Sequence, residues 1–187
     1  AMEGFVGVRG VIAPRRLREL SRRSDARGLI QTASHLGAIA GSAAALAYTW
    51  GTWWGVPFFV LLGMLINQLY AGEHECYHGT AFKSRWLNDW LGRLFGFLVV
   101  YPSDYDKWNH FAHHANTQDW EKDPELYKRK PFTSPWGYLW MFTGIPYFWG
   151  HFAAILRQAT GDVTDYFLND RQRRLVVLAA RWHVAGY

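Results

Sequence analysis

The sequence lacks several features that are common in soluble domains. It has one cysteine, Cys76, in 187 residues, so no disulfide can form within the chain and a reducing compartment suits it. More unusually, residues 29–72 contain no Asp, Glu, Lys or Arg. One crossing of a bilayer needs about 20 apolar residues, so this charge-free run is long enough for two. Apolar residues make up 50% of the chain, which excludes a disordered or collagen-like protein.

The charge-free run predicts a transmembrane helical hairpin over residues 29–72. Gly51, Gly55 and Pro57 interrupt the helical pattern near its middle, and tryptophans cluster there, as is typical of a membrane–water boundary. A buried pair of soluble helices is the alternative. Residues 1–28 carry seven arginines and three acids. Because positive flanks stay in the cytoplasm, this basic arm predicts that the first helix runs outward and the second returns.

A basic arm can also bind nucleic acid. Because the arm directly precedes the predicted hairpin, we favour the role in topology and expect no nucleic-acid partner.

Histidines are concentrated in two short motifs. His74 and His78 are four residues apart, and His110, His113 and His114 form the second motif, so each set lies on one face of a predicted helix. Together they are five of the eight histidines in the chain. Imidazole is the commonest metal ligand and suits iron, zinc, copper and nickel, so the two motifs predict a shared metal site.

The first motif also satisfies the HExxH pattern of zinc proteases, in which Glu75 would act as the general base. A catalytic zinc needs three protein ligands and keeps one open position, whereas five clustered histidines are present here. This supply favours a site with two metal ions over an intramembrane zinc protease. An inactive lipid-binding protein is a further hypothesis.

Residues 72–89 (GEHECYHGTAFKSRWLND) and 108–126 (WNHFAHHANTQDWEKDPEL) resemble the membrane fatty acid desaturase and hydroxylase superfamily, whose histidine boxes read HxxxH, HxxHH and HxxHH. The resemblance implies two iron ions held by the five histidines. It also implies use of O₂ and of electrons from a ferredoxin- or cytochrome b5-type donor to attack a C–H bond of a lipid acyl chain. The family's typical product is a double bond, and hydroxylation of a lipid or carotenoid is the alternative.

The third box of the family is missing from this sequence. Only His151 and His183 follow His114, and neither lies in an HxxHH motif. We therefore expect a C-terminal truncation and a chain that is inactive alone; a naturally reduced site is the alternative. Ligation of a metal by His151 is a weaker hypothesis, because a lone histidine among aromatic residues is more often an interfacial side chain.

Carboxylates are expected to orient the ligand imidazoles through the ring nitrogen that does not bind metal. The candidates are Glu75, Asp104, Asp106, Asp119 and Asp123. Each has an alternative interpretation as a solvated loop charge. Candidates for lining the lipid entrance are Trp86, Asn88 and Trp90. The apolar segment 90–101 is too short to cross a bilayer, so we expect it to lie in the interface or to re-enter.

The whole chain is predicted to be one incomplete all-α domain of a multi-pass membrane protein, with its metal site on the cytoplasmic face. The predicted parts are a basic arm (1–28), a transmembrane hairpin (29–72), a histidine-rich cytoplasmic region (73–130), interfacial helices (131–156) and the start of a further span (175–187). Gly144 and Pro146 divide the fourth part, for which a single crossing is the alternative. The expected partners are the bilayer, a lipid acyl substrate and an electron-transfer protein.

Overall fold

The computed structural model describes residues 12–126 and 134–187. Over these residues the chain forms eight α-helices, which confirms the all-α prediction for the described part. Their bounds are α1 (Pro14–Leu20), α2 (Asp25–Tyr48), α3 (Gly55–His78), α4 (Arg85–Leu98), α5 (Ser103–Asn116), α6 (Pro135–Phe142), α7 (Ile145–Ala159) and α8 (Asp170–Gly186). The first eleven residues of the predicted basic arm, and the junction at 127–133, lie outside the described residues.

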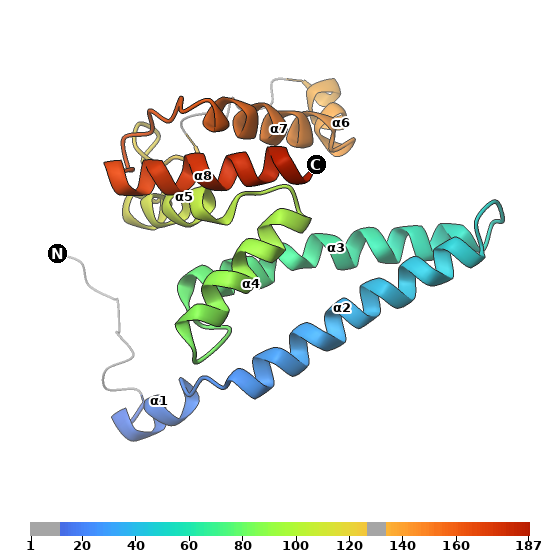
Figure 1. Cartoon of the computed structure of the whole chain (residues 1–187), viewed down its shortest axis with the longest axis horizontal. Coiled ribbons are helices and arrows are strands. Elements are labelled where there is room, and N and C mark those ends of the chain that lie inside the picture. Colours follow the sequence, from blue (N-terminus) through green and yellow to red (C-terminus); the bar gives the residue numbers. More distant parts are fainter. Residues whose placement is uncertain (1–11, 127–133) are drawn as a thin grey trace.

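Helices α2 and α3 form the predicted hairpin (Figure 1). The break falls at residues 49–54, where Gly51 has a φ of 81°, a region of backbone conformation that favours glycine. Within the part of the chain that the structure describes, one helix is both long and apolar enough to cross a membrane. This helix is α3, whose 18-residue window has a mean hydropathy of 1.5. The two crossings, their orientation and the multi-pass topology remain predictions.

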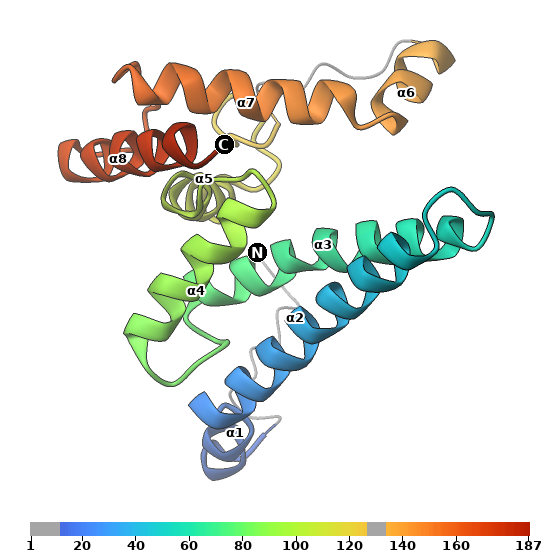
Figure 2. The same cartoon turned by 45° about the vertical axis from the view of Figure 1, so that its right-hand side comes forward.

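Helix α4 turns back along the end of α3, so the two histidines of α3 are held in a packed region (Figure 2). Gly79, with a φ of 68°, ends α3 in the left-handed conformation typical of a helix C-terminus. The two helices approach closely at glycines: a Cβ at Gly92 would lie 3.1 Å from Cys76 Cβ, and one at Gly96 would lie 2.6 Å from Glu73 Oε1. The predicted interfacial or re-entrant segment 90–101 therefore includes the second half of a helix that packs against α3.

Helices α5, α7 and α8 form a second layer, with α6 at its edge (Figure 1). Val163, Leu168 and Val176 form a buried cluster, against which Tyr105 and Trp108 of α5 pack. Gly144, with a φ of 71°, separates α6 from α7, which agrees with the predicted division of 131–156. Helix α8 begins at Asp170, before the predicted span start at residue 175, because Asn169 caps its first turn. Crossing of the membrane by α8 remains a prediction.

Candidate metal centre

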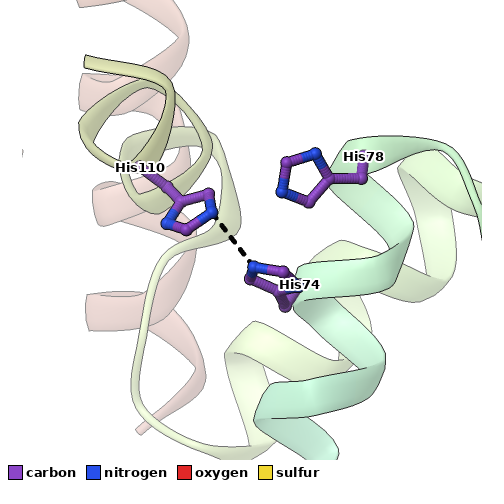
Figure 3. A group of neighbouring side chains, drawn as sticks. All are labelled: His74, His78 and His110. Atoms are coloured by element: carbon purple, nitrogen blue, oxygen red, sulfur yellow. Dashed lines mark hydrogen bonds between the residues drawn. The ribbon is translucent and has the colours of Figure 1, made fainter. Parts of the chain in front are cut away.

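Helices α3 and α5 bring the two histidine motifs together (Figure 3). His74 and His78 lie in the last turns of α3, and His110 lies on the facing side of α5. The Nε2 atoms of His74 and His110 are 3.0 Å apart. One ring nitrogen from each of the three side chains lies within 4.8 Å of the others. Residues 36 positions apart in the sequence thus point their imidazole nitrogens at one another.

The other two predicted ligands lie beside this group on α5. The ring centroid of His114 is 4.4 Å from that of His110 and 5.4 Å from that of His78. The ring of His113 is 5.9 Å from those of both His110 and His114. The five histidines therefore form one cluster, and their roles as ligands remain a prediction.

The two histidines after the second motif have other neighbours. The ring of His151 lies 4.4 Å from Tyr101 and 4.2 Å from Tyr147, and burial lowers its pKa to about 4. His183 uses Nδ1 to bond the Ala179 carbonyl oxygen at 2.8 Å. These contacts favour the interpretation of both residues as packing side chains.

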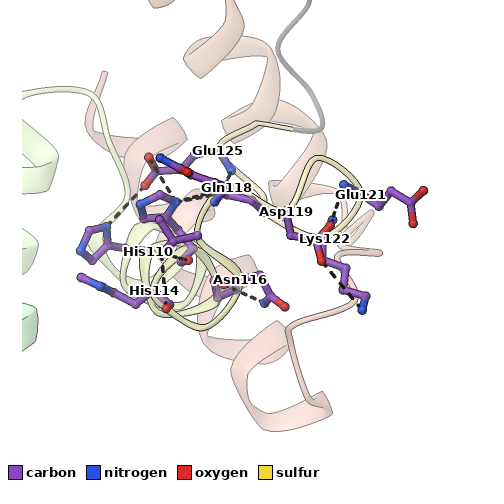
Figure 4. Close-up of polar contacts among 12 residues, drawn as sticks. His110, His114, Asn116, Gln118, Asp119, Glu121, Lys122 and Glu125 are labelled. Atoms are coloured by element: carbon purple, nitrogen blue, oxygen red, sulfur yellow. Dashed lines mark hydrogen bonds and ion pairs between the residues drawn. The ribbon is translucent and has the colours of Figure 1, made fainter. Parts of the chain in front are cut away.

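Two carboxylates from the segment after α5 contact the imidazoles of that helix. Both Asp123 oxygens lie 2.9 Å from His113 Nδ1, and Glu125 Oε1 lies 3.4 Å from His110 Nδ1 (Figure 4). When Nδ1 donates to a carboxylate, Nε2 is left free to bind metal. Asp123 was among the predicted orienting acids, whereas Glu125 was missed. No local pattern in the sequence marks Glu125, because its contact with His110 depends on how the chain folds back after α5.

The segment 117–126 is folded so that Asp123 faces inward. Asp123 is completely buried and also accepts from the backbone N–H groups of Gln118 (3.1 Å) and Glu125 (2.9 Å). Burial alone would raise the pKa of Asp123, but the bond from His113 and these two backbone bonds outweigh burial and lower it. The carboxylate is therefore held charged beside an imidazole, the state that suits an orienting acid.

Asp106 connects the two helices that carry the motifs. The Tyr77 hydroxyl, on α3, donates to Asp106 Oδ2 on α5 at 2.6 Å. Tyr77 lies between the two histidines of α3, and Asp106 lies one turn before His110. Burial raises the pKa of Asp106 to about 6, against the lowering effect of bonds from Tyr77 and Tyr101. This contact joins α3 to α5, and the predicted role of Asp106 in orienting an imidazole stays a prediction.

The remaining predicted acids have other partners. Asp104 forms a two-point pair with Arg93, at 2.9 and 3.1 Å. Asp119 accepts backbone N–H groups in its own turn and lies 3.9 Å from Lys122 Nζ. Both carboxylates therefore have partners other than the clustered histidines.

Glu75 accepts a hydrogen bond from the Thr80 hydroxyl, and its other oxygen is 3.7 Å from His74 Nδ1. This separation is longer than a hydrogen bond, so Glu75 is near an imidazole without bonding it.

Of the three residues predicted to line the lipid entrance, two are exposed and one is buried. Trp86 and Trp90 lie on the outer face of α4, 63% and 67% exposed. Asn88 is buried, and its amide bonds the backbone N–H and C=O of Phe82 at 3.2 and 2.9 Å. It therefore fixes the loop between α3 and α4, a role for which the sequence pattern gave no indication.

The geometry of the cluster can be compared with that of a metal site. Two nitrogens that each lie about 2.1 Å from one ion are about 3.0–3.4 Å apart. The His74–His110 separation of 3.0 Å fits this range, and the nitrogen of His78 lies close enough to join them after a small movement. A set of imidazole nitrogens with carboxylates behind them suits iron as well as zinc. The residues present therefore fit a bound metal.

Comparisons with known proteins agree with this geometry. The sequence model of the fatty acid desaturase family matches residues 51–187. An sn-1 acyl-lipid omega-3 desaturase (ferredoxin) of Synechocystis sp. is 38% identical over 95 residues, which cover 49% of this chain and 26% of the relative. Beta-carotene 4-ketolase 3 of Haematococcus lacustris is 36% identical over 81 residues, 42% of this chain and 25% of the relative.

A further relative is the sn-1 oleoyl-lipid 12-desaturase of Anabaena variabilis, 28% identical over 88 residues, 46% of this chain and 25% of the relative. The aligned part of the chain thus spans about a quarter of the length of these curated relatives. No solved structure matches the chain significantly.

Proposed function

The chain belongs to the fatty acid desaturase family, and on that premise we propose that it is an oxygen-dependent lipid oxidoreductase with a histidine-ligated di-iron centre. The observation that carries the proposal is the convergence of His74, His78 and His110 from two helices, with ligand nitrogens within 4.8 Å. Members of this family are membrane-associated, which agrees with the apolar helix α3 that leads into the cluster.

The bound iron would supply the capacity to react with O₂ and two donated electrons and to abstract hydrogen from an unactivated C–H bond. Our proposal assigns the imidazoles of α3 and α5 to hold the iron. Glu125 and Asp123 accept from Nδ1 of His110 and His113, which fixes the tautomer that offers Nε2. Tyr77 and Asp106 hold the two helices at the spacing that this arrangement needs.

We propose introduction of a double bond into an acyl chain as the reaction. The support is that lipid desaturases are among the relatives, two of which match the chain over 95 and 88 residues. A ferredoxin- or cytochrome b5-type protein is proposed as the electron donor, since one relative is an acyl-lipid omega-3 desaturase (ferredoxin). The location of the histidines at the C-terminal end of α3 supports a cytoplasmic site beside the membrane surface, given the predicted topology.

A carotenoid substrate is the second candidate. It is favoured by the beta-carotene ketolase, whose match to this chain is about as strong in identity as that of the desaturases. Oxygenation and desaturation both begin with hydrogen abstraction, so one histidine cluster suits either reaction. The two candidates differ in the shape of the substrate and not in the ligand set.

The contacts of Glu75 disfavour the zinc-protease hypothesis. A general base must be within hydrogen-bond reach of the water that it activates, beside the metal. Glu75 instead accepts from Thr80 and lines a cavity that α3 forms with α2. The family match and this contact favour the oxidoreductase.

The test is expression from the complete reading frame in a host whose membranes contain monounsaturated acyl lipids, with and without added beta-carotene. We expect iron near two ions per chain and an oxygen-dependent rise in polyunsaturated acyl chains, with neither in a His78→Ala variant. An oxygenated carotenoid with unchanged acyl chains would support the second candidate. One zinc ion per chain with unchanged lipids would contradict both.

A further inference from the structure

A second feature of α3 lies on the side turned away from the histidines. A cavity of about 660 Å³ separates α2 from α3, and its α3 wall includes Leu65, Leu69 and Gly72. Positions spaced by three or four residues share one face of a helix, so these residues form one stripe. At 100° per residue, His74 and His78 lie on the opposite face, toward α5. None of the five clustered histidines lines the cavity, and Glu75 is the lining residue that approaches them, with Oε1 3.7 Å from His74 Nδ1.

The cavity has a polar lining within a segment that carries no charge. Gln31, Thr32 and His35 contribute from α2, and Gln68 contributes from α3. His35 Nε2 lies 2.8 Å from the Leu65 carbonyl oxygen, which can only accept, so Nε2 carries the proton. In the neutral ring Nδ1 is then an acceptor, and each glutamine amide offers both donors and an acceptor. These groups match a ligand that both donates and accepts hydrogen bonds.

One end of the cavity is closed by the loop between α3 and α4. Phe82 in this loop is 1% exposed, and a Cβ at Gly28 would lie 2.6 Å from its ring. Glycine at position 28 therefore lets α2 approach the loop. Asn88 holds the loop through its two bonds to the Phe82 backbone. The closed end is thus built from fixed side chains, as expected for a pre-formed ligand site.

The charge of the lining limits the class of ligand. Among the described residues that line the cavity there is no Lys or Arg, and the carboxylate of Glu75 lies at its rim. A phosphate group would find a like charge there and no cation, whereas a hydroxyl group could donate to this carboxylate. The apolar wall formed by Leu65, Leu69 and Phe95 suits hydrocarbon chains.

We propose that the cavity between α2 and α3 binds an uncharged lipid with a free hydroxyl group, of the diacylglycerol class. The volume lies within the range of about 300–1,000 Å³ that is usual for small-molecule sites. The bound lipid lies against α3, whose length and apolarity suit a membrane. This proposal does not depend on iron or on the oxidation reaction, because none of the five clustered histidines lines the cavity.

The test uses the chain reconstituted in phosphatidylcholine vesicles with a trace of dioleoylglycerol that carries a photoreactive diazirine in one acyl chain. After illumination, labelled residues are mapped by mass spectrometry. We expect labelling of residues 28–35 and 65–72 that falls when excess unlabelled dioleoylglycerol is added. Labelling around Val60, which is 50% exposed and outside the lining, should be unaffected by the competitor because it reports bulk lipid.

Matched variants test the polar lining. A Gln31→Leu/Gln68→Leu double variant should raise the half-saturating concentration of dioleoylglycerol about tenfold, since it removes the amide partners. Asn67→Leu makes the same kind of change outside the lining and should leave that concentration unchanged. Circular dichroism and iron content, measured on each variant, separate loss of lipid binding from loss of folding or of the metal centre.

Three results would each overturn the proposal. The first is labelling of the cavity residues that the competitor does not reduce. The second is competition by phosphatidylglycerol as strong as that by dioleoylglycerol. The third is occupation of the cavity by a helix of another chain, which a chemical crosslink between chains at Gln31 or Gln68 would reveal.

Discussion

The two histidine motifs are held in different ways. On α5, His110 and His113 each face a carboxylate at Nδ1, at 3.4 and 2.9 Å. On α3, the carboxylate nearest to His74 Nδ1 among the described acids is Glu75, at 3.7 Å, beyond hydrogen-bond distance. The α5 motif is therefore oriented by hydrogen bonds to acids, whereas the α3 motif is oriented by packing of its helix.

Helix packing around α3 explains how its histidines are oriented without hydrogen bonds to carboxylates. Helix α4 lies against it at Gly92 and Gly96, where larger side chains would clash. The bond between Tyr77 and Asp106 then fixes α3 relative to α5. A motif held by helix packing should respond to changes in helix spacing, and a motif held by carboxylates should respond to changes in charge. The following variants test this difference.

The largest effect is expected for His110→Ala, because His110 contacts both motifs. Its ring lies 4.6 Å from that of His74, 5.2 Å from that of His78 and 4.4 Å from that of His114. Its removal should abolish iron loading, measured by plasma mass spectrometry of the purified chain, and activity of the full reading frame. His151→Phe is the control, since His151 packs between two tyrosines elsewhere. Equal iron content in the two variants would show that the motifs do not share a site.

Asp123→Asn should lower iron affinity about 10- to 100-fold, the usual cost of removing a group that orients a ligand imidazole. The substitution keeps the size of the side chain and removes the charge that faces His113. Asp119→Asn in the same segment is the control, because an amide oxygen can still accept the backbone N–H groups that Asp119 accepts. Iron titration with a competing chelator measures both. Equal losses would assign the effect to the segment and not to the carboxylate.

Tyr77→Phe should destabilise the fold by about 1–3 kcal/mol, because the buried Asp106 loses a donor. Tyr77 helps to stabilise the charged carboxylate, so the pKa of Asp106 should rise further above about 6. The destabilisation should be complete above the raised pKa of the variant, where the carboxylate is charged in both proteins, and should shrink as the pH falls from there to about 6. Denaturant unfolding in detergent, measured once above the raised pKa of the variant and once below about 6, gives the size of the effect. Tyr48→Phe is the control, because Tyr48 is 93% exposed. A loss that does not change with pH would contradict the role of Asp106.

Much of the fold follows from local sequence patterns. The break in the hairpin and the division at Gly144 were predicted from glycine and proline, and the structure has its helix ends there. Helix α8 begins earlier than the predicted span because a cap, and not the first apolar residue, sets a helix start. Apolarity predicted where membrane segments would lie but gave no helix boundaries.

The histidine motifs were predictable because their spacing is helical, and so was the presence of carboxylates near their imidazoles. The choice among the acids was not, because it depends on long-range contacts. Asp104 forms an ion pair with Arg93, which lies eleven residues earlier in the sequence, and not with a histidine of the site. Glu125 contacts His110 because the chain reverses its direction after Thr117. Neither the pairing nor the reversal has a local pattern that a single sequence displays.

Glu75→Gln should have the smallest effect on iron affinity. It tests the α3 motif, whereas Asp123→Asn tests the α5 motif. If α3 is oriented by packing alone, the charge at position 75 is not needed, and iron affinity should stay within about twofold of the parent value, far from the cost of losing an orienting acid. The amide can still accept from Thr80, so the local fold is kept. A fall of tenfold or more would mean that Glu75 bonds His74 once metal is bound. Both motifs would then be oriented by carboxylates, and the difference between them would be a property of the metal-free state.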